Sequence, residues 1–296
     1  MKFLNALGFL TVIKIPRRFY LKKEQFPDTL IYFPAVGLII GLFISIFFTA
    51  LRFIFPLFLT AVFAVGLEII LTGGLHIDGV ADMFDGTFSG ESDKNKILEI
   101  MKKGDVGVFG IIIIVFTIIL KIGFIYFIAS MLPGMSGLPA ILAIIFFTPA
   151  FGRWSMLYLF SKYEPVKREG SLTNIFTGRN SKKIFGMSSL YFLTSFILVN
   201  SLFSILNFFV FNNRLLFSGF LSGVVAGVIH QNSWLLVLFF ILKNLLIILL
   251  LYAFLMAAGK FFTRRIGGIS GDIIGGVCVL TEIMFLILNY LSIRFL

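Results

Sequence analysis

The chain has little charge, few histidines and a single cysteine. Only 13% of its 296 residues are Asp, Glu, Lys or Arg, whereas 59% are hydrophobic and the mean hydropathy is +1.04. A soluble globule of this length has too little interior to bury 39 Phe residues together with long Ile and Leu runs. Soluble enzymes, secreted disulfide scaffolds and disordered proteins are therefore excluded. We expect an all-α, polytopic membrane helix bundle.

The shortage of cysteine and the excess of basic residues each narrow the function further. With Cys278 alone, the chain can form neither an internal disulfide nor a Cys-based metal site. A net charge of +11 would suggest nucleic acid in a soluble protein, but in a membrane protein Lys and Arg accumulate in cytoplasmic loops. We therefore expect the lipid bilayer as a partner and no nucleic acid. The sequence leaves a homo-oligomer open.

Seven segments have the roughly 20 mostly apolar residues that a membrane-spanning helix needs. They are Leu30–Leu51, Phe53–Thr72, Val108–Ser130, Leu138–Phe160, Ile184–Phe211, Trp234–Ala257 and Ile273–Ser292. Leu215–Ile229 is shorter and rich in Gly and Ser, and we interpret it as re-entrant or interfacial. No repeat or polar linker divides the chain, so residues 1–296 are expected to form a single integral-membrane domain.

The basic residues suggest which ends of the spans face the cytoplasm. They form three groups, Lys14/Arg17/Arg18/Lys22/Lys23, Lys162/Lys167/Arg168/Arg179/Lys182/Lys183 and Lys260/Arg264/Arg265. If the chain has seven spans and its amino terminus is inside the cell, all three groups lie on the cytoplasmic side, where Lys and Arg are favoured. We therefore expect a multi-pass protein of the cell membrane. The first residues, 1–29, are expected to be an interfacial segment, because Phe3, Leu7 and Leu10 share one helical face.

An acidic segment, residues 73–107, carries the strongest chemical signal and is expected to be a cytoplasmic active-site loop. Asp78, Asp82 and Asp85 are spaced i, i+4, i+7, so a helix would point all three carboxylates the same way. Like charges on one face repel, and a divalent cation removes that conflict. Mg²⁺ is usually held by one or two carboxylates, waters and substrate phosphates. The alternative is a solvated acidic loop paired with basic neighbours.

Several flanking residues fit the same site. Gly73, Gly74 and Gly79 allow the backbone to approach a ligand closely. A short helix after Ser92-Asp93 ends with Lys102, which either faces a pyrophosphate or compensates the helix dipole.

A second Gly-rich stretch lies at Gly267–Gly276, just before the last span. Its Gly271 and Asp272 stand where a helix start can cradle phosphate oxygens, and Asp272 alternatively caps that helix.

Ionisable residues inside predicted spans are expensive and functional by default. Arg153, Glu68, Lys121, Lys243 and Glu282 belong to this class.

The only histidine near the aspartates is His76, which we consider as a ligand or proton-transfer group.

These motifs resemble the signature of the cobalamin synthase (adenosylcobinamide-GDP ribazoletransferase) family. The segments that carry the resemblance are TGGLHIDGVADMFDG (Thr72–Gly86), LEIMKKGDVGVFG (Leu98–Gly110), FLTVIKIP (Phe9–Pro16), FPAVGLIIG (Phe33–Gly41), GRWSM (Gly152–Met156) and ISGDIIGG (Ile269–Gly276) with Thr281-Glu282. Lys103-Gly104 and the apolar Val277–Leu280 depart from the pattern.

The resemblance implies a Mg²⁺-dependent membrane phosphotransferase of late cobalamin synthesis. α-Ribazole, or its 5′-phosphate, would attack the phosphate attached to adenosylcobinamide, releasing GMP. Asp78, Asp82 and Asp85 would carry Mg²⁺, Lys102 and Arg153 would neutralise phosphates, and Asp272 would complete the site.

Two alternatives remain at this point. A CDP-alcohol-type phosphotransferase also uses an Asp-rich helix, but its pattern has Arg where this chain has Asp82. A secondary transporter would show an inverted repeat and charged residues near mid-span, whereas the acidic residues of this chain cluster in one segment.

Overall fold

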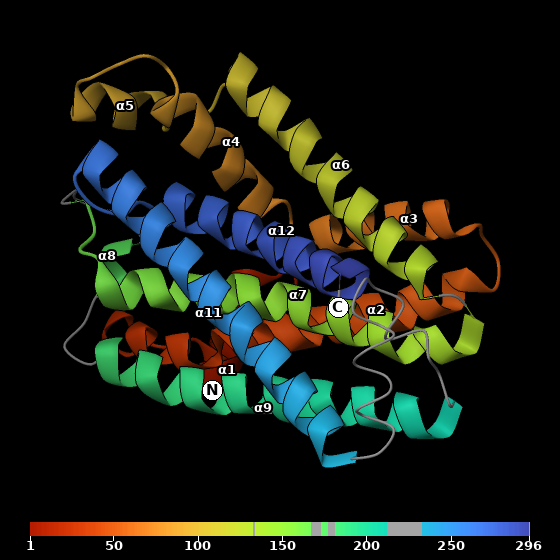
Figure 1. The fold of residues 1–296 in the computed structure, drawn as a ribbon. Coiled ribbons are helices and arrows are strands. Elements are labelled where there is room, and N and C mark those ends of the chain that lie inside the picture. Colours follow the sequence, from red (N-terminus) through yellow and green to blue (C-terminus); the bar gives the residue numbers. More distant parts are fainter. Residues whose placement is uncertain (133, 167–172, 177–180, 212–232, 296) are drawn as a thin grey trace.

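The protein is a bundle of long helices, described here from a computed structural model that covers all residues except 133, 167–172, 177–180, 212–232 and 296 (Figure 1). Its α-helices are α1 (Lys2–Leu10), α2 (Phe33–Arg52), α3 (Leu57–Thr72), α4 (Leu75–Thr87), α5 (Lys94–Ile100), α6 (Val108–Met131), α7 (Gly134–Lys162), α8 (Thr173–Phe176), α9 (Ser181–Phe211), α11 (Ser233–Ile266) and α12 (Gly271–Phe295). Two 3₁₀ segments, η1 (Arg17–Phe19) and η2 (Lys23–Tyr32), join α1 to α2. In the described residues the only β contact is an isolated bridge between Pro165 and Ile269.

Six helices are long and apolar enough to cross a membrane, and a bent pair, α3 with α4, brings the number to as many as seven. This confirms the membrane helix bundle expected from the sequence. The residue limits differ slightly at turns: α3 begins at Leu57, directly after Pro56, whose ring disfavours helical backbone at the preceding residue. Leu215–Ile229 lies outside the described residues.

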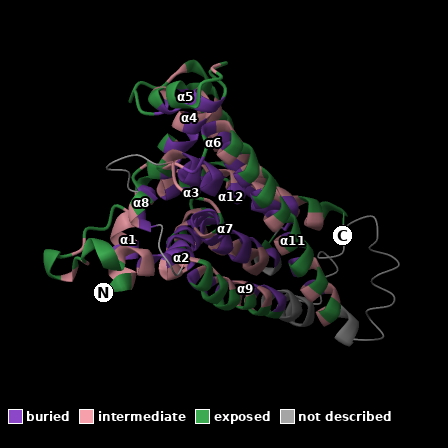
Figure 2. Ribbon diagram, turned by 90° about the vertical axis from the view of Figure 1, so that its left-hand side faces the viewer, coloured by how far each residue is buried: buried purple, intermediate pink, exposed green. Residues whose placement is uncertain are grey.

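The bundle is built around α7 and α12. In their membrane-length windows 83% and 72% of residues are buried, against 22% for α6 and α11 (Figure 2). The outer side of α6 exposes a row of apolar side chains, including Val108, Ile111, Ile112, Val115 and Ile119. A continuous apolar surface of this kind suits contact with lipid tails.

The acidic segment 73–107 is largely helical rather than a loop. It contains α4 and α5, and α4 turns away from α3 at 89° (Figure 1). The turn is made by Gly73 and Gly74, whose φ angles of +62° and +73° are in the left-handed region that glycine adopts without strain. Their amides donate to the carbonyls of Ile70 and Ile69, which ends α3 in a pattern typical of helix C-termini.

The amino terminus is only partly helical. Residues 2–10 form α1, the helix ends there and Thr11 is extended, so Phe3, Leu7 and Leu10 lie within a helix of nine residues. Leu10 is fully buried, and Phe3 and Leu7 pack against the core. One face of α1 therefore packs against the core of the bundle.

Candidate active site

The aspartates of α4 lie beside the start of α12. Asp78 is exposed, while Asp82 and Asp272 are partly buried, and Asp82 is repelled by the charges of Asp78, Asp272 and Asp85. The structure thus brings together two motifs that are about 190 residues apart in sequence. The like charges leave a surplus of negative charge there, which a cation would relieve.

Close packing of backbone on backbone creates this proximity. A Cβ atom added to Gly79 would lie 3.0 Å from the Asp272 carbonyl oxygen and 3.3 Å from the Gly275 Cα atom. Gly79 is therefore buried in the contact between α4 and α12, whereas Gly271 and Gly74 have open space around the Cβ position. Of the glycines expected to approach a ligand, Gly74 and Gly271 have room beside them, Gly73 lies next to Val12, and Gly79 serves helix packing. Contact of Gly74 and Gly271 with a ligand stays a prediction.

Asp272 does not cap α12. The amide of Ile273 donates to the Ser270 hydroxyl at 3.3 Å, so Ser270 takes the capping position. The Asp272 side chain interacts with Ser270 and is attracted to Lys102. Lys102 follows α5, a helix that begins at the N-cap Asp93 as expected. The structure thus places one cation of the sequence prediction near the carboxylates.

Asp85 has partners that sequence spacing did not reveal. Its two carboxylate oxygens accept hydrogen bonds from the backbone amides of Gly107 at 2.7 Å and Gly110 at 2.9 Å. A Cβ atom on either glycine would collide with this carboxylate. Asp85 therefore anchors the start of α6, and with it the segment that carries Lys102, to α4.

The α4–α5 connection is also tied to the end of α11. Arg265 donates to the carbonyl oxygens of Thr87 at 3.3 Å and Glu91 at 2.7 Å. The Glu91 carboxylate in turn accepts from the amides of Ser92 and Asp93, and these hydrogen bonds lower its pKa. The connection between α4 and α5 is thus held by contacts to α11 and by hydrogen bonds within the connection itself.

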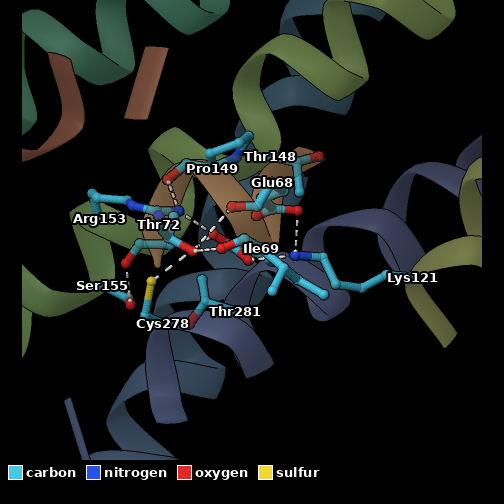
Figure 3. A network of polar contacts seen from close by, with 12 residues as sticks. Glu68, Ile69, Thr72, Lys121, Thr148, Pro149, Arg153, Ser155, Cys278 and Thr281 are labelled. Atoms are coloured by element: carbon cyan, nitrogen blue, oxygen red, sulfur yellow. Dashed lines mark hydrogen bonds and ion pairs between the residues drawn. The ribbon is translucent and has the colours of Figure 1, made fainter. Parts of the chain in front are cut away.

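Arg153 lies elsewhere, in a buried charged cluster between the helices (Figure 3). Lys121 donates to Glu68 and Glu282 at 2.7 Å each, and Arg153 donates to Glu282. Figure 3 shows Lys121 and Arg153 entering from opposite sides. All four charged groups are at most 7% exposed. Arg153 thus neutralises a carboxylate inside the bundle and is not brought to the open aspartates.

His76 lines the same cluster. Its side chain is 4% exposed, and neither ring nitrogen has a hydrogen-bond partner among the described residues. With Lys121 and Arg153 it borders a cavity of about 10 Å³, close to the smallest space that holds one water molecule. Its position is on the buried side of α4, away from Asp78, and a role in proton transfer stays a prediction.

The donor set fits Mg²⁺ bound together with a substrate. In the part of the chain that the structure describes, no three His, Cys, Asp or Glu side chains form a complete metal site. Magnesium sites of phosphotransferases commonly use one or two carboxylates, with phosphate oxygens and waters completing the shell. Asp78 and Asp82 can supply those carboxylates.

Comparison with known proteins covers nearly the whole chain. The family model described as cobalamin-5-phosphate synthase matches residues 2–290. The chain belongs to the cobalamin-5-phosphate synthase family. Two relatives named adenosylcobinamide-GDP ribazoletransferase, from Acetivibrio thermocellus and Clostridium tetani, are each 30% identical, covering 98% of this chain and 99% and 98% of their own lengths. A third, from Clostridioides difficile, is 29% identical over 99% of this chain and 98% of its own length. No solved structure matches.

The family assignment makes this chain a membrane transferase of cobalamin synthesis and lets the anchoring role of Asp85 be tested by activity. We expect Asp85→Asn to lower kcat about tenfold. The NH₂ group that replaces one carboxylate oxygen cannot accept a hydrogen bond, so one of the two backbone amides, of Gly107 or Gly110, loses its acceptor. Gly110→Ala should have the same effect, since its Cβ atom would displace the carboxylate. The Mg²⁺ concentration for half-maximal rate should not change in either variant.

The matched control is Gly123→Ala, in the middle of α6, where a Cβ atom meets nothing within 4 Å. It should keep wild-type activity. Full activity of Gly110→Ala, combined with a raised Mg²⁺ requirement in Asp85→Asn, would instead make Asp85 a metal ligand.

Proposed function

We propose that this chain transfers the cobinamide phosphate of adenosylcobinamide-GDP to α-ribazole or its 5′-phosphate. GMP is released, and adenosylcobalamin or its 5′-phosphate is formed. The observation that carries the proposal is the meeting of Asp78 and Asp82 on α4 with Asp272 on α12, within the family that the comparisons assign. The names of the relatives supply the substrates.

In this proposal the chain mainly positions groups and balances charge, which is the main work of phosphoryl transfer. Asp78 and Asp82 would hold Mg²⁺, which would neutralise the pyrophosphate of the activated substrate. Lys102 adds a positive charge on the phosphate side. Asp272 accepts the proton of the ribazole hydroxyl as its oxygen attacks phosphorus, and the bond to the GMP oxygen breaks.

The experiment is GMP release by purified protein given adenosylcobinamide-GDP, α-ribazole and Mg²⁺, with each component omitted in turn. We expect GMP to form only when all three are present, and a cobalamin product to appear in equal amount. Release of CMP from a CDP-alcohol in the presence of a lipid acceptor instead would assign the other phosphotransferase reaction. No release, with substrate carried across a vesicle membrane, would assign transport.

We also propose that this site faces the cytoplasm. Arg265, of the third basic group, contacts the α4–α5 connection. Ile269, just before α12, forms backbone hydrogen bonds with Glu164 and Val166, which lie in the segment of the second group. Near the first group, the Val12 amide donates to the Leu71 carbonyl at the end of α3. Parts of all three basic groups thus lie at the end of the bundle that carries the aspartates. Lys and Arg favour the cytoplasmic side.

Cysteine labelling in intact cells checks the orientation. Because native Cys278 is buried, an introduced cysteine can be read separately. Ser270→Cys should be protected from an impermeant reagent, and Ile54→Cys, exposed at the turn between α2 and α3, should react. Labelling of Ser270→Cys from outside would contradict the proposed orientation.

A further inference from the structure

A cavity of about 750 Å³ lies between α1 and the segment that follows it, Thr11–Leu21. We call it the N-terminal cavity. Its walls and rim include Gly8, Phe9, Lys14, Arg17, Tyr20 and Phe26. Ligand pockets for molecules of nucleotide size typically have volumes of this order. The sequence indicated only an interfacial segment here, because neither the extended path after Thr11 nor the contacts that hold it can be read from periodicity.

The cavity is built by specific contacts and does not depend on a ligand for its shape. Asn5, which is 4% exposed, donates to the Phe19 carbonyl at 2.7 Å and accepts from the Leu21 amide at 3.2 Å. These two bonds clamp the far end of the segment onto α1. The near end is held by the Val12 amide, which donates to the Leu71 carbonyl at 2.9 Å.

One wall of the cavity is aromatic and rigid. The Phe9 ring packs against Phe33 and Phe176, with ring centroids 6.1 and 5.0 Å apart, and Phe26 meets Phe176 edge-on at 6.0 Å. Phe33 and Phe176 are buried. A flat heteroaromatic base can stack on such a surface with little loss of side-chain entropy.

The charges of the cavity are of one sign. Among the described residues, Lys14 and Arg17 line it and no Asp or Glu does. Within the described part of the chain, neither cation forms an ion pair. Unpaired cations beside an apolar, aromatic wall match a ligand that combines a base with a phosphate.

The cavity also adjoins the candidate active site. The Val12 amide donates a hydrogen bond to a carbonyl in the last turn of α3. Its side chain would lie 3.1 Å from a Cβ atom added to Gly73, which is at the turn between α3 and α4, the helix that carries the aspartates. A nucleotide held here would therefore have the transferred phosphate on the side of Asp78.

We propose that the N-terminal cavity binds a nucleoside 5′-phosphate, namely the guanosine nucleotide part of the activated substrate. This rests on the proposed function. The guanine stacks on the aromatic wall, and Lys14 and Arg17 bind the phosphate that leaves with GMP. Unesterified α-ribazole has no phosphate, so two cations suit the leaving nucleotide better than that acceptor. α-Ribazole 5′-phosphate does carry one, and separate KM values for donor and acceptor distinguish it from the leaving nucleotide.

The test measures GMP binding to the full-length protein in nanodiscs of phosphatidylcholine, which carries no net charge. Arg17→Gln and Lys14→Gln should each weaken GMP binding about tenfold, the loss expected for one charge-assisted hydrogen bond. Guanosine, which lacks the phosphate, should bind weakly and equally to all variants. The matched control is Arg18→Gln, because Arg18 lies over the Phe19 ring and does not line the cavity.

Turnover supplies a second reading. Arg17→Gln should raise KM for adenosylcobinamide-GDP and leave KM for α-ribazole unchanged. Unaltered GMP affinity in both Arg17→Gln and Lys14→Gln would overturn the proposal. So would a defect that appears only as lost dependence on phosphatidylglycerol, since that result would assign the cations to a lipid headgroup.

The two proposals can fail separately. A wild-type protein that binds GMP through Arg17 but releases none from adenosylcobinamide-GDP retains the nucleotide site and loses the proposed reaction. A protein that turns over normally with both cations replaced retains the reaction and loses the nucleotide site.

Discussion

Asp82→Asn should lower the rate of GMP release by a factor of about 10² to 10³ or more, while the protein still folds in detergent. Such a loss is typical when one group that stabilises transition-state charge is removed. Asp82 lies between Asp78 and Asp85 on α4 and is also repelled by the charge of Asp272 on α12. It is therefore the carboxylate that interacts with both the α4 motif and the α12 motif. The measurement is initial rate against Mg²⁺ concentration, with helix content and elution volume as checks of folding.

The matched control is Asp105→Asn, which removes an exposed carboxylate from the α5–α6 connection. It should keep near-wild-type rates. Substantial activity of Asp82→Asn at saturating Mg²⁺ would remove this residue from the metal site.

Lys121→Met should cause a large loss of stability. It leaves Glu68 and Glu282 with Arg153 alone, deep inside the bundle. Removing one partner of a buried ion pair typically costs about 3–5 kcal/mol, because the remaining charge is desolvated without compensation. Thermal unfolding in detergent, followed by circular dichroism, should show a clearly lowered Tm.

A second substitution separates charge balance from packing. Lys121→Met combined with Glu68→Gln removes one charge of each sign and should recover much of the lost stability. Lys243→Met is the control: Lys243 lies over the Phe240 ring in α11, and such a contact is worth about 0.5–2 kcal/mol, less than a buried ion pair. Additive losses in the double variant would contradict the charge-balance explanation.

Features set by local periodicity could be predicted from the sequence. Apolar length identified the spans, and the i, i+4, i+7 spacing placed the three aspartates on one side of a helix that the structure contains as α4. The cap at Asp93 predicted the start of α5. The family resemblance also implied that Asp272 completes the site of the α4 aspartates, and α4 does meet the start of α12.

Features set by contacts between distant segments could not be predicted in the same way. The amides that Asp85 binds are 22 and 25 residues away, and spacing alone gives no sign of them. The sequence marked Arg153 as functional because it lies in a span, but only the structure shows that its partner is Glu282, 129 residues distant. The same limit hid the N-terminal cavity.

A double-mutant cycle on GMP release tests most directly that α4 and α12 form one catalytic centre. We expect Asp82→Ala and Asp272→Ala each to reduce the rate strongly, and the double variant to be little worse than either, because groups that act as a unit are not additive. Since Ser270 caps α12, Asp272→Ala should leave the Tm unchanged. Reductions that multiply in the double variant, or near-normal turnover in Asp272→Ala, would contradict a shared centre.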